Sequence, residues 1–345
     1  MDSFEEKMKN RPHVVILGAG ASVAAIPTGD ANGKKISAMA GFIDKLGMSD
    51  VIASCNLNTT SDNLEDVYME LHERDDESML FHNARLKLEH RIEEYFSSYQ
   101  ITAHPTVYDF LILALTKKDL IATFNWDPLL MQAYQRCVYY TRNLPQLAFL
   151  HGNVAVGVCE KDNIAGVVGK VCSGCGEFFL PMRLLYPIKN KDYTSNWYIA
   201  KSWRKLQYYL SRAYRLTIFG YSAPKSDVAA VSMLKSAWGA VEDRSLEEIE
   251  IIDIADEEKV RCSWMDFIHT HHYSVHKQFF DSALGTYPRR TCDVLFDNTM
   301  NVMWSYDDRG FKDSMDFHDI ERLITPLLAD ELAKKEGDIL NNPYV

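Results

Sequence analysis

The sequence predicts an α/β protein built on a doubly wound parallel sheet. Five short apolar runs are typical of strands that are buried on both faces, and stretches with helical spacing separate them. Several of these runs end directly in a polar or glycine-rich tip, which is typical of ligand-binding α/β sheets. The predicted strands cover residues 13–17, 119–123, 145–149, 214–219 and 249–253.

Size and composition limit the kind of protein. A chain of 345 residues predicts one large domain with insertions, or two domains. No apolar run approaches the ~18 residues of a membrane span, and the charged start lacks the apolar region of a signal peptide. The net charge of −11 argues against a protein surface that binds nucleic acid through its phosphates, because such a surface needs clustered Lys and Arg. We therefore expect a soluble cytoplasmic protein that contacts neither a membrane nor nucleic acid directly.

The order of elements predicts a core over residues 12–255 that carries two insertions. A helical insertion at 31–105 is expected to lie over the site, with a helix at 31–46, an N-cap at Ser61 or Asp62, and helices within 64–100. A compact, loop-rich insertion with three cysteines is expected at 154–190. Residues 256–345 form an extension with predicted helices at 262–284 and 316–335 and an extended stretch at 292–305. Further helices are predicted from Ala21, at 106–116, at 126–139, around Trp197–Leu210 and from about Ser226.

Three tips are expected to form one site, because ligands of open parallel sheets bind at the carboxyl ends of the strands. Gly18-Ala-Gly-Ala-Ser22 follows the first strand, and its glycines would let the backbone approach a phosphate. Phe124-Asn-Trp-Asp127 offers an amide and a carboxylate, and Leu150-His-Gly-Asn153 offers an imidazole. Val23 replaces the third glycine of the dinucleotide fingerprint, and no acidic strand end follows about 20 residues later, which disfavours an ordinary dehydrogenase.

Each of these residues also has a simpler interpretation. Ser22 could bind phosphate or cap a helix, and Asp127 could be only a helix cap, although a cap does not account for Asn125. His151 alone would more often be structural. Two later strand ends are expected at the same edge of the sheet. Gly220-Tyr-Ser222 with Asp227 could belong to the site, or could be only a tight turn with an N-cap. Asp253 could bind a ribose hydroxyl, or could only solvate the edge of the sheet.

Together these motifs resemble the sirtuin superfamily, in particular its divergent bacterial branch of NAD-consuming domains found in antiviral defence. The resemblance covers residues 12–255 and implies a Rossmann-like sirtuin core. The glycine loop with Ile26-Pro27 resembles the family's NAD loop, and Phe124–Asp127 its Thr-Asn-Tyr-Asp motif. Leu150-His151-Gly152 resembles the catalytic Leu-His-Gly, and Gly220-Tyr221-Ser222 with Asp227 the late motif of this branch.

The resemblance implies a glycohydrolase that cleaves its substrate NAD to nicotinamide and ADP-ribose, as a regulated effector of antiphage defence. His151 would be the general base, Asn125 would hold a ribose hydroxyl or the attacking water, and Asp127 would orient them. The alternatives are an NAD-dependent protein deacylase and a non-catalytic subunit that binds NAD or ADP-ribose. Thr28-Gly29-Asp30 replaces the Asp-Phe-Arg of the deacylases, which counts against the first. The residues expected to bind NAD are Gly18, Ala19, Gly20, Ser22, Gly220, Ser222 and Asp253.

Cysteines suggest a metal site. Cys172-Ser-Gly-Cys175-Gly resembles one knuckle of the sirtuin zinc module, but the earlier half offers only Cys159, with Asp162 where a fourth cysteine is expected. Because structural zinc has four ligands, the sequence predicts an irregular or a lost zinc site. His269, His272 and His276 would share a helical face, although exposed histidines on a polar face explain them more simply.

Partners are predicted only in outline. The resemblance implies a homo-oligomer, controlled by a separately encoded protein such as a ring-forming ATPase. Aromatic residues at Trp197–Tyr209 and Trp264–Phe280 could form an apolar interface, or could pack onto the sheet.

Overall fold

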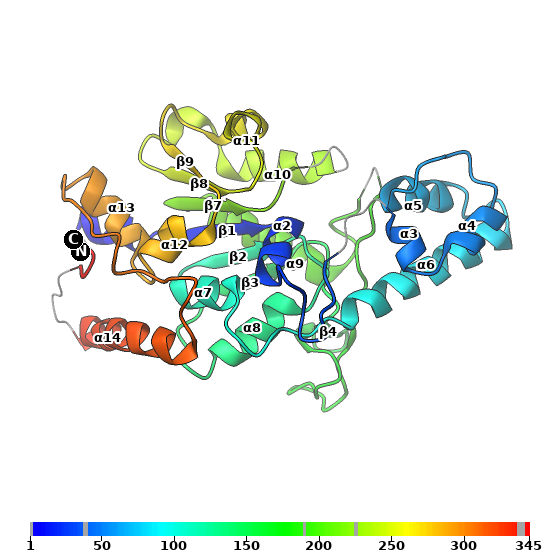
Figure 1. Cartoon of the computed structure of the whole chain (residues 1–345), viewed down its shortest axis with the longest axis horizontal. Helices are drawn as coiled ribbons and strands as arrows, with labels where there is room; N and C mark the ends of the chain where they lie inside the picture. The colour runs from blue at the N-terminus through cyan, green and yellow to red at the C-terminus, as the bar shows by residue number, and fades with distance from the viewer. Residues whose placement is uncertain (1–2, 37–40, 189–190, 224–226, 337–341) are drawn as a thin grey trace.

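A six-stranded, fully parallel sheet forms the centre of the molecule (Figure 1), with the strand order β3-β2-β1-β7-β8-β9. The computed structural model describes residues 3–36, 41–188, 191–223, 227–336 and 342–345. The strands are β1 (His13–Leu17), β2 (Leu120–Thr123), β3 (Gln146–Phe149), β7 (Arg215–Phe219), β8 (Glu248–Ile252) and β9 (Tyr273–His276).

The strand order is that of a Rossmann-type sheet. The chain adds β1, β2 and β3 toward one edge and then β7, β8 and β9 toward the other, so the strand order reverses between β1 and β7. Every residue of these two strands is buried, which explains why both are rich in apolar residues. The polar exceptions are His13, Arg215 and Thr217, and they interact with one another or with Glu250. A doubly wound sheet binds ligands at the carboxyl edge of this reversal. The sheet therefore places the tips after Leu17 and Phe219 at the expected binding position.

Helices cover both faces of the sheet. Right-handed crossovers run in opposite directions from β1, so the crossover helices that pack on the sheet between β1 and β3 lie on one face, and the crossover helices between β3 and β9 lie on the other. The first layer contains α2 (Ala19–Ala25), α7 (Val107–Ala114) and α8 (Leu129–Cys137), which contact one another. The second contains α9 (Trp197–Leu210), which packs on β2 and β3, and α10 (Val228–Trp238). The predicted doubly wound fold is confirmed. The predicted helix start at Ser226 lies outside the described residues.

The helical insertion extends from one end of the sheet (Figure 1). It contains α3 (Phe42–Lys45), α4 (Ser49–Ser54), α5 (Leu64–Glu73) and α6 (Met79–Ser97). Residues 31–36 are not helical, contrary to the prediction, and 37–40 lie outside the described residues. The N-cap of α5 is Asn63, not Ser61 or Asp62, because the Asn63 side chain accepts the N–H of Glu65.

The two ends of this insertion are fastened together. The N–H of Ala31 donates to the carbonyl of Gln100 at 2.8 Å, and the N–H of Gln100 donates to the Asp30 carboxylate at 2.9 Å. Asp30 is buried and also accepts the N–H of Lys34 at 2.9 Å. Hydrogen bonds to backbone N–H groups favour the charged carboxylate, and they lower the pKa of Asp30 although burial opposes this.

The second insertion is a small antiparallel sheet with the strand order β5-β4-β6. It consists of β4 (Val156–Cys159), β5 (Ile164–Val167) and β6 (Leu180–Pro181). An isolated bridge between Val171 and Phe178 closes the loop that carries two of its cysteines. This agrees with the compact module expected from the sequence.

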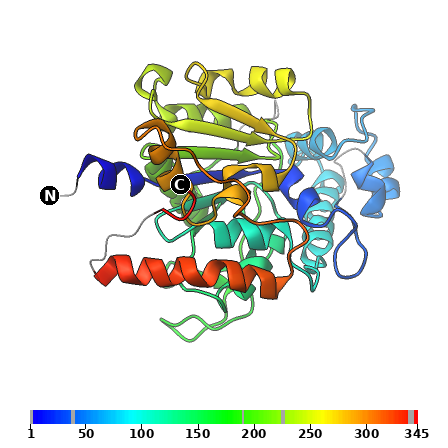
Figure 2. The ribbon, with the colours of Figure 1, turned by 60° about the vertical axis from the view of Figure 1, so that its left-hand side comes forward.

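The extension after β8 differs from the prediction in two places. The predicted helix at 262–284 is divided into α11 (Glu257–Trp264), the edge strand β9 and α12 (Ala283–Thr286), so the main sheet continues past residue 255. The stretch at 292–305, predicted as extended, begins as the helix α13 (Thr291–Thr299). The predicted last helix is α14 (Phe317–Glu336), which lies outside the layer of α7 and α8 (Figure 2).

The aromatic segments proposed as an interface are largely internal. Trp264 is 2% exposed and Trp203 is 3% exposed, so both belong to the core. The alternative, that these residues pack within the molecule, is the one the structure supports. None of the helices among the described residues has the length and apolar character needed to cross a membrane.

Candidate active site

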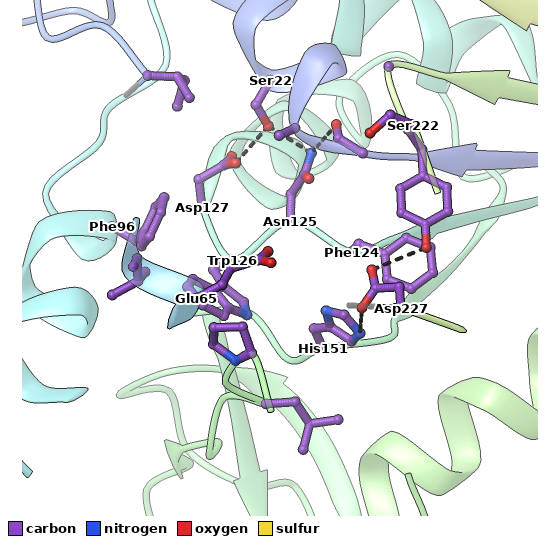
Figure 3. Close-up of a pocket in the computed structure, with 18 of the residues that line it drawn as sticks. Ser22, Glu65, Phe96, Phe124, Asn125, Trp126, Asp127, His151, Ser222 and Asp227 are labelled. Carbon is purple, nitrogen blue, oxygen red and sulfur yellow. Dashed lines mark hydrogen bonds and ion pairs between the residues drawn. The ribbon is translucent and has the colours of Figure 1, made fainter. Parts of the chain in front are cut away.

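A pocket of about 300 Å³ opens at the carboxyl ends of β1, β2, β3 and β7 (Figure 3). It brings together most of the residues that the sequence singled out. Gly20 does not line it, and neither does Asp253, whose carboxylate accepts the N–H of Ala255 at 2.7 Å. The predicted residues in its wall are Gly18, Ala19, Ser22, Asn125, Asp127, His151, Gly220 and Ser222.

The glycines at this edge allow two backbone turns to touch. A Cβ on Gly18 would lie 2.5 Å from the Gly220 carbonyl oxygen, and one on Gly20 would lie 2.7 Å from the Gly220 Cα. The N–H of Gly20 donates to that carbonyl at 3.0 Å, so it is not directed at a ligand. In the turn 18–21, Ala19 is the residue whose N–H has no hydrogen bond to a described residue. The glycine motif therefore serves close packing first.

Asn125 is held by a buried hydrogen-bond network. Its amide Nδ2 donates to the Gly18 carbonyl at 2.8 Å and to the Ser22 hydroxyl at 2.9 Å. Ser22 in turn donates to the Asp127 carboxylate at 2.6 Å, and it contacts the Tyr108 hydroxyl at 2.7 Å. Because the amide nitrogen faces this network, the Oδ1 atom is the one left to accept from a ligand. No described residue donates to it.

Asp127 orients the network from inside the protein. Its carboxylate is buried, accepts the N–H of Leu129 at 3.1 Å, and has its pKa raised by burial. Asn153 links the second and third tips, because its amide donates to the backbone carbonyls of Asp127 at 2.6 Å and Asn125 at 3.2 Å. The three tips thus form one hydrogen-bonded unit, which fixes the geometry of the pocket.

His151 is neutral at pH 7. Burial, reinforced by the nearby positive charge of Lys191, lowers the pKa of its imidazole to about 3, and Asp227 opposes this only in part. The imidazole Nε2 lies 3.3 Å from the Tyr193 hydroxyl and 4.0 Å from the Asp227 carboxylate. Phe124 packs edge-on against the ring, with centroids 4.8 Å apart. The neutral imidazole has a free lone pair that can accept a proton, and its low pKa makes it a weak base in the ligand-free pocket.

A buried ion pair stands beside His151. Lys191 donates to Asp227, and Asp227 also accepts the Tyr221 hydroxyl at 3.1 Å. Both side chains are less than 10% exposed and both line the pocket. Burial of an ion pair is costly unless its members are well bonded, as Asp227 is here.

The helical insertion forms the opposite wall. Leu64, Glu65 and Phe96 reach the pocket from α5 and α6. The Glu65 carboxylate points into the space between Asp127 and His151 (Figure 3), and no described residue hydrogen-bonds or ion-pairs with it. The prediction that this insertion lies over the site agrees with these contacts.

Trp126 lies between the two walls. Its ring is 9% exposed and packs edge-on against Phe96, with centroids 5.6 Å apart. Its indole Nε1 is buried without a hydrogen-bond partner among the described residues, and it lies on the pocket side of the ring (Figure 3). An unpaired buried donor is costly, so one at a pocket wall points to a ligand acceptor.

Sequence reasoning missed several residues of the pocket. Glu65 lines the pocket but gives only a helix-start signal. Tyr108, which supports the pocket from behind through Ser22, lies within an apolar helix and gives only a core signal. Lys191 follows no strand and belongs to no recognisable motif. Trp126 was visible between Asn125 and Asp127, but without a role.

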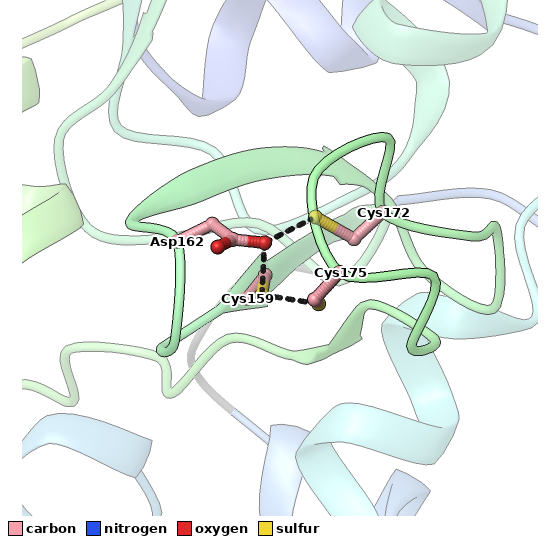
Figure 4. A group of neighbouring side chains, drawn as sticks. All are labelled: Cys159, Asp162, Cys172 and Cys175. Carbon is pink, nitrogen blue, oxygen red and sulfur yellow. Dashed lines mark hydrogen bonds between the residues drawn. The ribbon is translucent and has the colours of Figure 1, made fainter.

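Cys159, Asp162, Cys172 and Cys175 form a second cluster (Figure 4), with their ligand atoms within 4.8 Å of one another. The sulfurs of Cys159 and Cys175 are 3.5 Å apart, and the Cys172 sulfur is 3.3 Å from the Asp162 carboxylate. A tetrahedral zinc with bonds of ~2.3 Å requires sulfurs about 3.8 Å apart, so the group fits this metal. Asp162 stands as the fourth donor.

Asp162 has room in this cluster because residue 174 is a glycine. A Cβ on Gly174 would lie 2.4 Å from the Asp162 carboxylate oxygen. The loop itself is closed by hydrogen bonds from the Cys172 N–H to Glu177 at 2.7 Å and from the Gly176 N–H to Cys172 at 3.0 Å. The histidines at 269 and 272 are not on a helix, and His276 belongs to β9, so they do not share the helical face considered above.

No protein-family model matches the chain, and no curated protein matches its sequence. Its structure is similar to solved Sir2 structures. One is a mutant Sir2 homologue in complex with ADP-ribose, with 14% identity, 95% of this chain and 98% of that chain covered, and a TM-score of 0.38. A structure described as the basis for the mechanism and regulation of Sir2 enzymes has 12% identity, coverage of 84% and 92%, and a TM-score of 0.41.

A third similar structure is a Sir2 complex with a p53 peptide and NAD⁺, with 13% identity, coverage of 88% and 100%, and a TM-score of 0.39. These structures belong to the family that the sequence motifs resemble.

Proposed function

We propose that this protein cleaves the N-glycosidic bond of NAD, releasing nicotinamide and ADP-ribose. The observation that carries the proposal is the placement of a neutral imidazole, His151, and an oriented amide, Asn125, in one pocket at the reversal point of a doubly wound sheet. Such a reversal point is where sheets of this kind bind nucleotides. The sirtuin-like motifs of the sequence support NAD as the nucleotide.

The reaction needs one water and moves one proton. The water oxygen bonds to C1′ of the nicotinamide ribose, and the glycosidic electron pair leaves with the nicotinamide nitrogen, which becomes neutral. His151 accepts the proton that the water loses. Asn125 accepts a hydrogen bond from the water or from a ribose hydroxyl through Oδ1, because Nδ2 is already bound to Gly18 and Ser22.

NAD turnover by the purified chain tests this proposal. The protein is incubated with NAD alone and with NAD plus an acetyl-lysine peptide, and nicotinamide, ADP-ribose and acetylated ADP-ribose are separated by chromatography. Nicotinamide and ADP-ribose in equal amounts without peptide are expected. Products that form only with the peptide would indicate a deacylase instead. Binding of NAD without products under any condition would indicate a non-catalytic subunit.

We propose a structural zinc in the cysteine cluster, held by Cys159, Asp162, Cys172 and Cys175. The fit of the donor set and its spacing support this. The metal would fix the loop between β5 and β6, and none of these four residues lines the pocket.

We also propose that the enzyme acts as a homo-oligomer in antiphage defence, under the control of a separately encoded partner such as a ring-forming ATPase. The physiological reason is that unrestrained NAD cleavage would harm the host cell. Light scattering at micromolar concentration tests the first part, since a mass near 39.5 kDa would identify a monomer.

A further inference from the structure

Two ligand-directed groups of the pocket have no role in the proton transfer proposed above: one lies on the helical insertion and the other at the tip after β2. Glu65 presents a carboxylate with no described partner, and Trp126 presents a buried N–H without an acceptor. One is an acceptor with a negative charge and the other is a donor. Phe96 and the indole ring add flat apolar surface beside them.

This combination fits a planar, positively charged ring that bears a carboxamide. The negative carboxylate and the aromatic faces both attract a cationic ring. A carboxamide offers N–H donors for Glu65 and a carbonyl acceptor for the Trp126 N–H. A carboxylate in place of the carboxamide would offer no donor to Glu65 and would be repelled by its charge.

The neighbouring residues make Glu65 the discriminating group. Asp127 is committed to Ser22 and Leu129, and Asp227 is committed to Lys191 and Tyr221. Of the carboxylates in the pocket wall, Glu65 is the one that none of the described residues engages. The Asn63 side chain caps α5 by accepting the Glu65 N–H, so the backbone from which the Glu65 side chain extends is held in place.

We propose that Glu65, assisted by Trp126, is the specificity-determining residue of the pocket and selects a cationic ring with a carboxamide over one with a carboxylate. This inference rests on the proposed cleavage of NAD, whose departing base is such a ring. It assigns the choice of base to the helical insertion, whereas the strand tips carry the reaction. Discrimination of this kind depends on building repulsion against the wrong ligand.

Two uncleavable bases test the proposal without turnover. 1-Methylnicotinamide and 1-methylnicotinate share the cationic ring and differ only in amide and acid. Calorimetric titration of the full chain should show at least a ~10-fold preference for the amide, on the usual scale for charge repulsion and a lost hydrogen bond. Glu65→Gln should remove most of the preference, and the indole N–H resonance of Trp126 should shift on binding of the amide.

Asp66→Asn is the matched control. Asp66 lies next to Glu65 in the first turn of α5, is exposed, and does not line the pocket. Its substitution removes the same charge and should leave the preference intact. Trp126→Phe keeps a ring and removes the N–H, so it should weaken amide binding without abolishing the preference against the acid. Circular dichroism confirms that each variant is folded.

The outcomes separate this inference from the proposed reaction. A preference that survives in Glu65→Gln, or that also disappears in Asp66→Asn, overturns the inference even if NAD is cleaved, as does failure of the wild-type chain to bind either base. A preference that depends on Glu65 supports the inference even if NAD is not cleaved, in which case only the proposed reaction fails. With cleavable substrates, Glu65→Gln should lower the kcat/KM ratio of NAD over its deamidated analogue by at least ~10-fold.

Discussion

The pocket and the cysteine cluster are both small polar sites, but they are built in opposite ways. The pocket gathers its reactive side chains from four strand ends, and the backbone beside each is held by the hydrogen bonds of the central sheet. The cysteine cluster lies within residues 159–175, and its donors mainly contact one another. Polar groups on a rigid frame can be changed at little cost to the fold, whereas a cluster that holds its own loop cannot. Activity and stability should therefore respond separately at the two sites.

The largest expected effect is on turnover. His151→Ala and Asn125→Ala should each lower kcat for NAD cleavage by ~10² or more, because each removes a group that acts on the reacting atoms. The melting temperature should change little. Chromatographic assay of nicotinamide release and a thermal melt provide the two measurements. Near-normal turnover in either folded variant would remove that residue from the mechanism.

The cysteine cluster should show the reverse pattern. Cys172→Ser should lose zinc, measured by elemental analysis of protein purified without chelator, and should melt a few degrees lower because one ligand bond is lost. NAD turnover well below the melting temperature should stay close to that of the wild type. Asp162→Cys completes a four-cysteine site and should retain zinc at chelator concentrations that strip the native protein. Protein with less than a tenth of an equivalent of zinc, and no change in melting on Cys172→Ser, would identify ordinary buried thiols.

A smaller effect is expected on pH dependence. Lys191 lowers the pKa of His151, so Lys191→Met should raise it, and Asp227 would then act unopposed in the same direction. A base must be unprotonated, so kcat/KM falls as pH drops through this pKa, and the acid limb should move to higher pH. Lys201→Met, which removes an exposed charge on α9, is the control and should leave the limb in place. Identical profiles for the Lys191→Met variant and the wild type would contradict the role of the ion pair.

The smallest expected effect is on the KM for NAD, at a residue that lies outside the pocket. Asp253 was expected to bind a ribose, but its carboxylate caps the loop after β8 through Ala255 and does not line the pocket. Asp253→Asn should therefore change the KM for NAD by less than about twofold, within the usual range for a surface substitution. A rise of tenfold with unchanged melting would restore it as a binding residue.

The sequence predicted the central strands well because their burial is nearly complete. Residues 13–17 and 215–219 are covered on both faces, so apolar residues dominate them: Val14 to Leu17 in the first strand, and Leu216, Ile218 and Phe219 in the second. The edge strand β9 has four half-buried residues and an alternating sequence, which gave no such signal. In α13, Val294, Leu295 and Phe296 are all buried, and this apolar run was interpreted as extended although packing makes it helical.

The site divides along the same line. Asn125 and His151 could be located because they follow strands, and the topology of the sheet dictates where strand ends meet. Glu65 and Lys191 could not, because they reach the pocket through the packing of insertions whose positions local sequence does not encode. The sequence also could not predict that the Gly20 N–H donates to the Gly220 carbonyl. A glycine motif alone does not reveal whether the backbone faces a phosphate or a second backbone turn.

The hydrogen bonds that join Asp30 and Ala31 to Gln100 at the base of the helical insertion have a consequence for how such proteins diversify. Asp30 and Gln100 close the insertion into a loop whose ends are already joined, so its interior can change in length and sequence without displacing β1 or β2. The strand ends that carry Asn125 and His151 can therefore stay unchanged while the helical insertion between Asp30 and Gln100 is replaced by another segment. Homologues that keep Asn125 and His151 but carry a different segment between these two anchors would be expected to act on a different base.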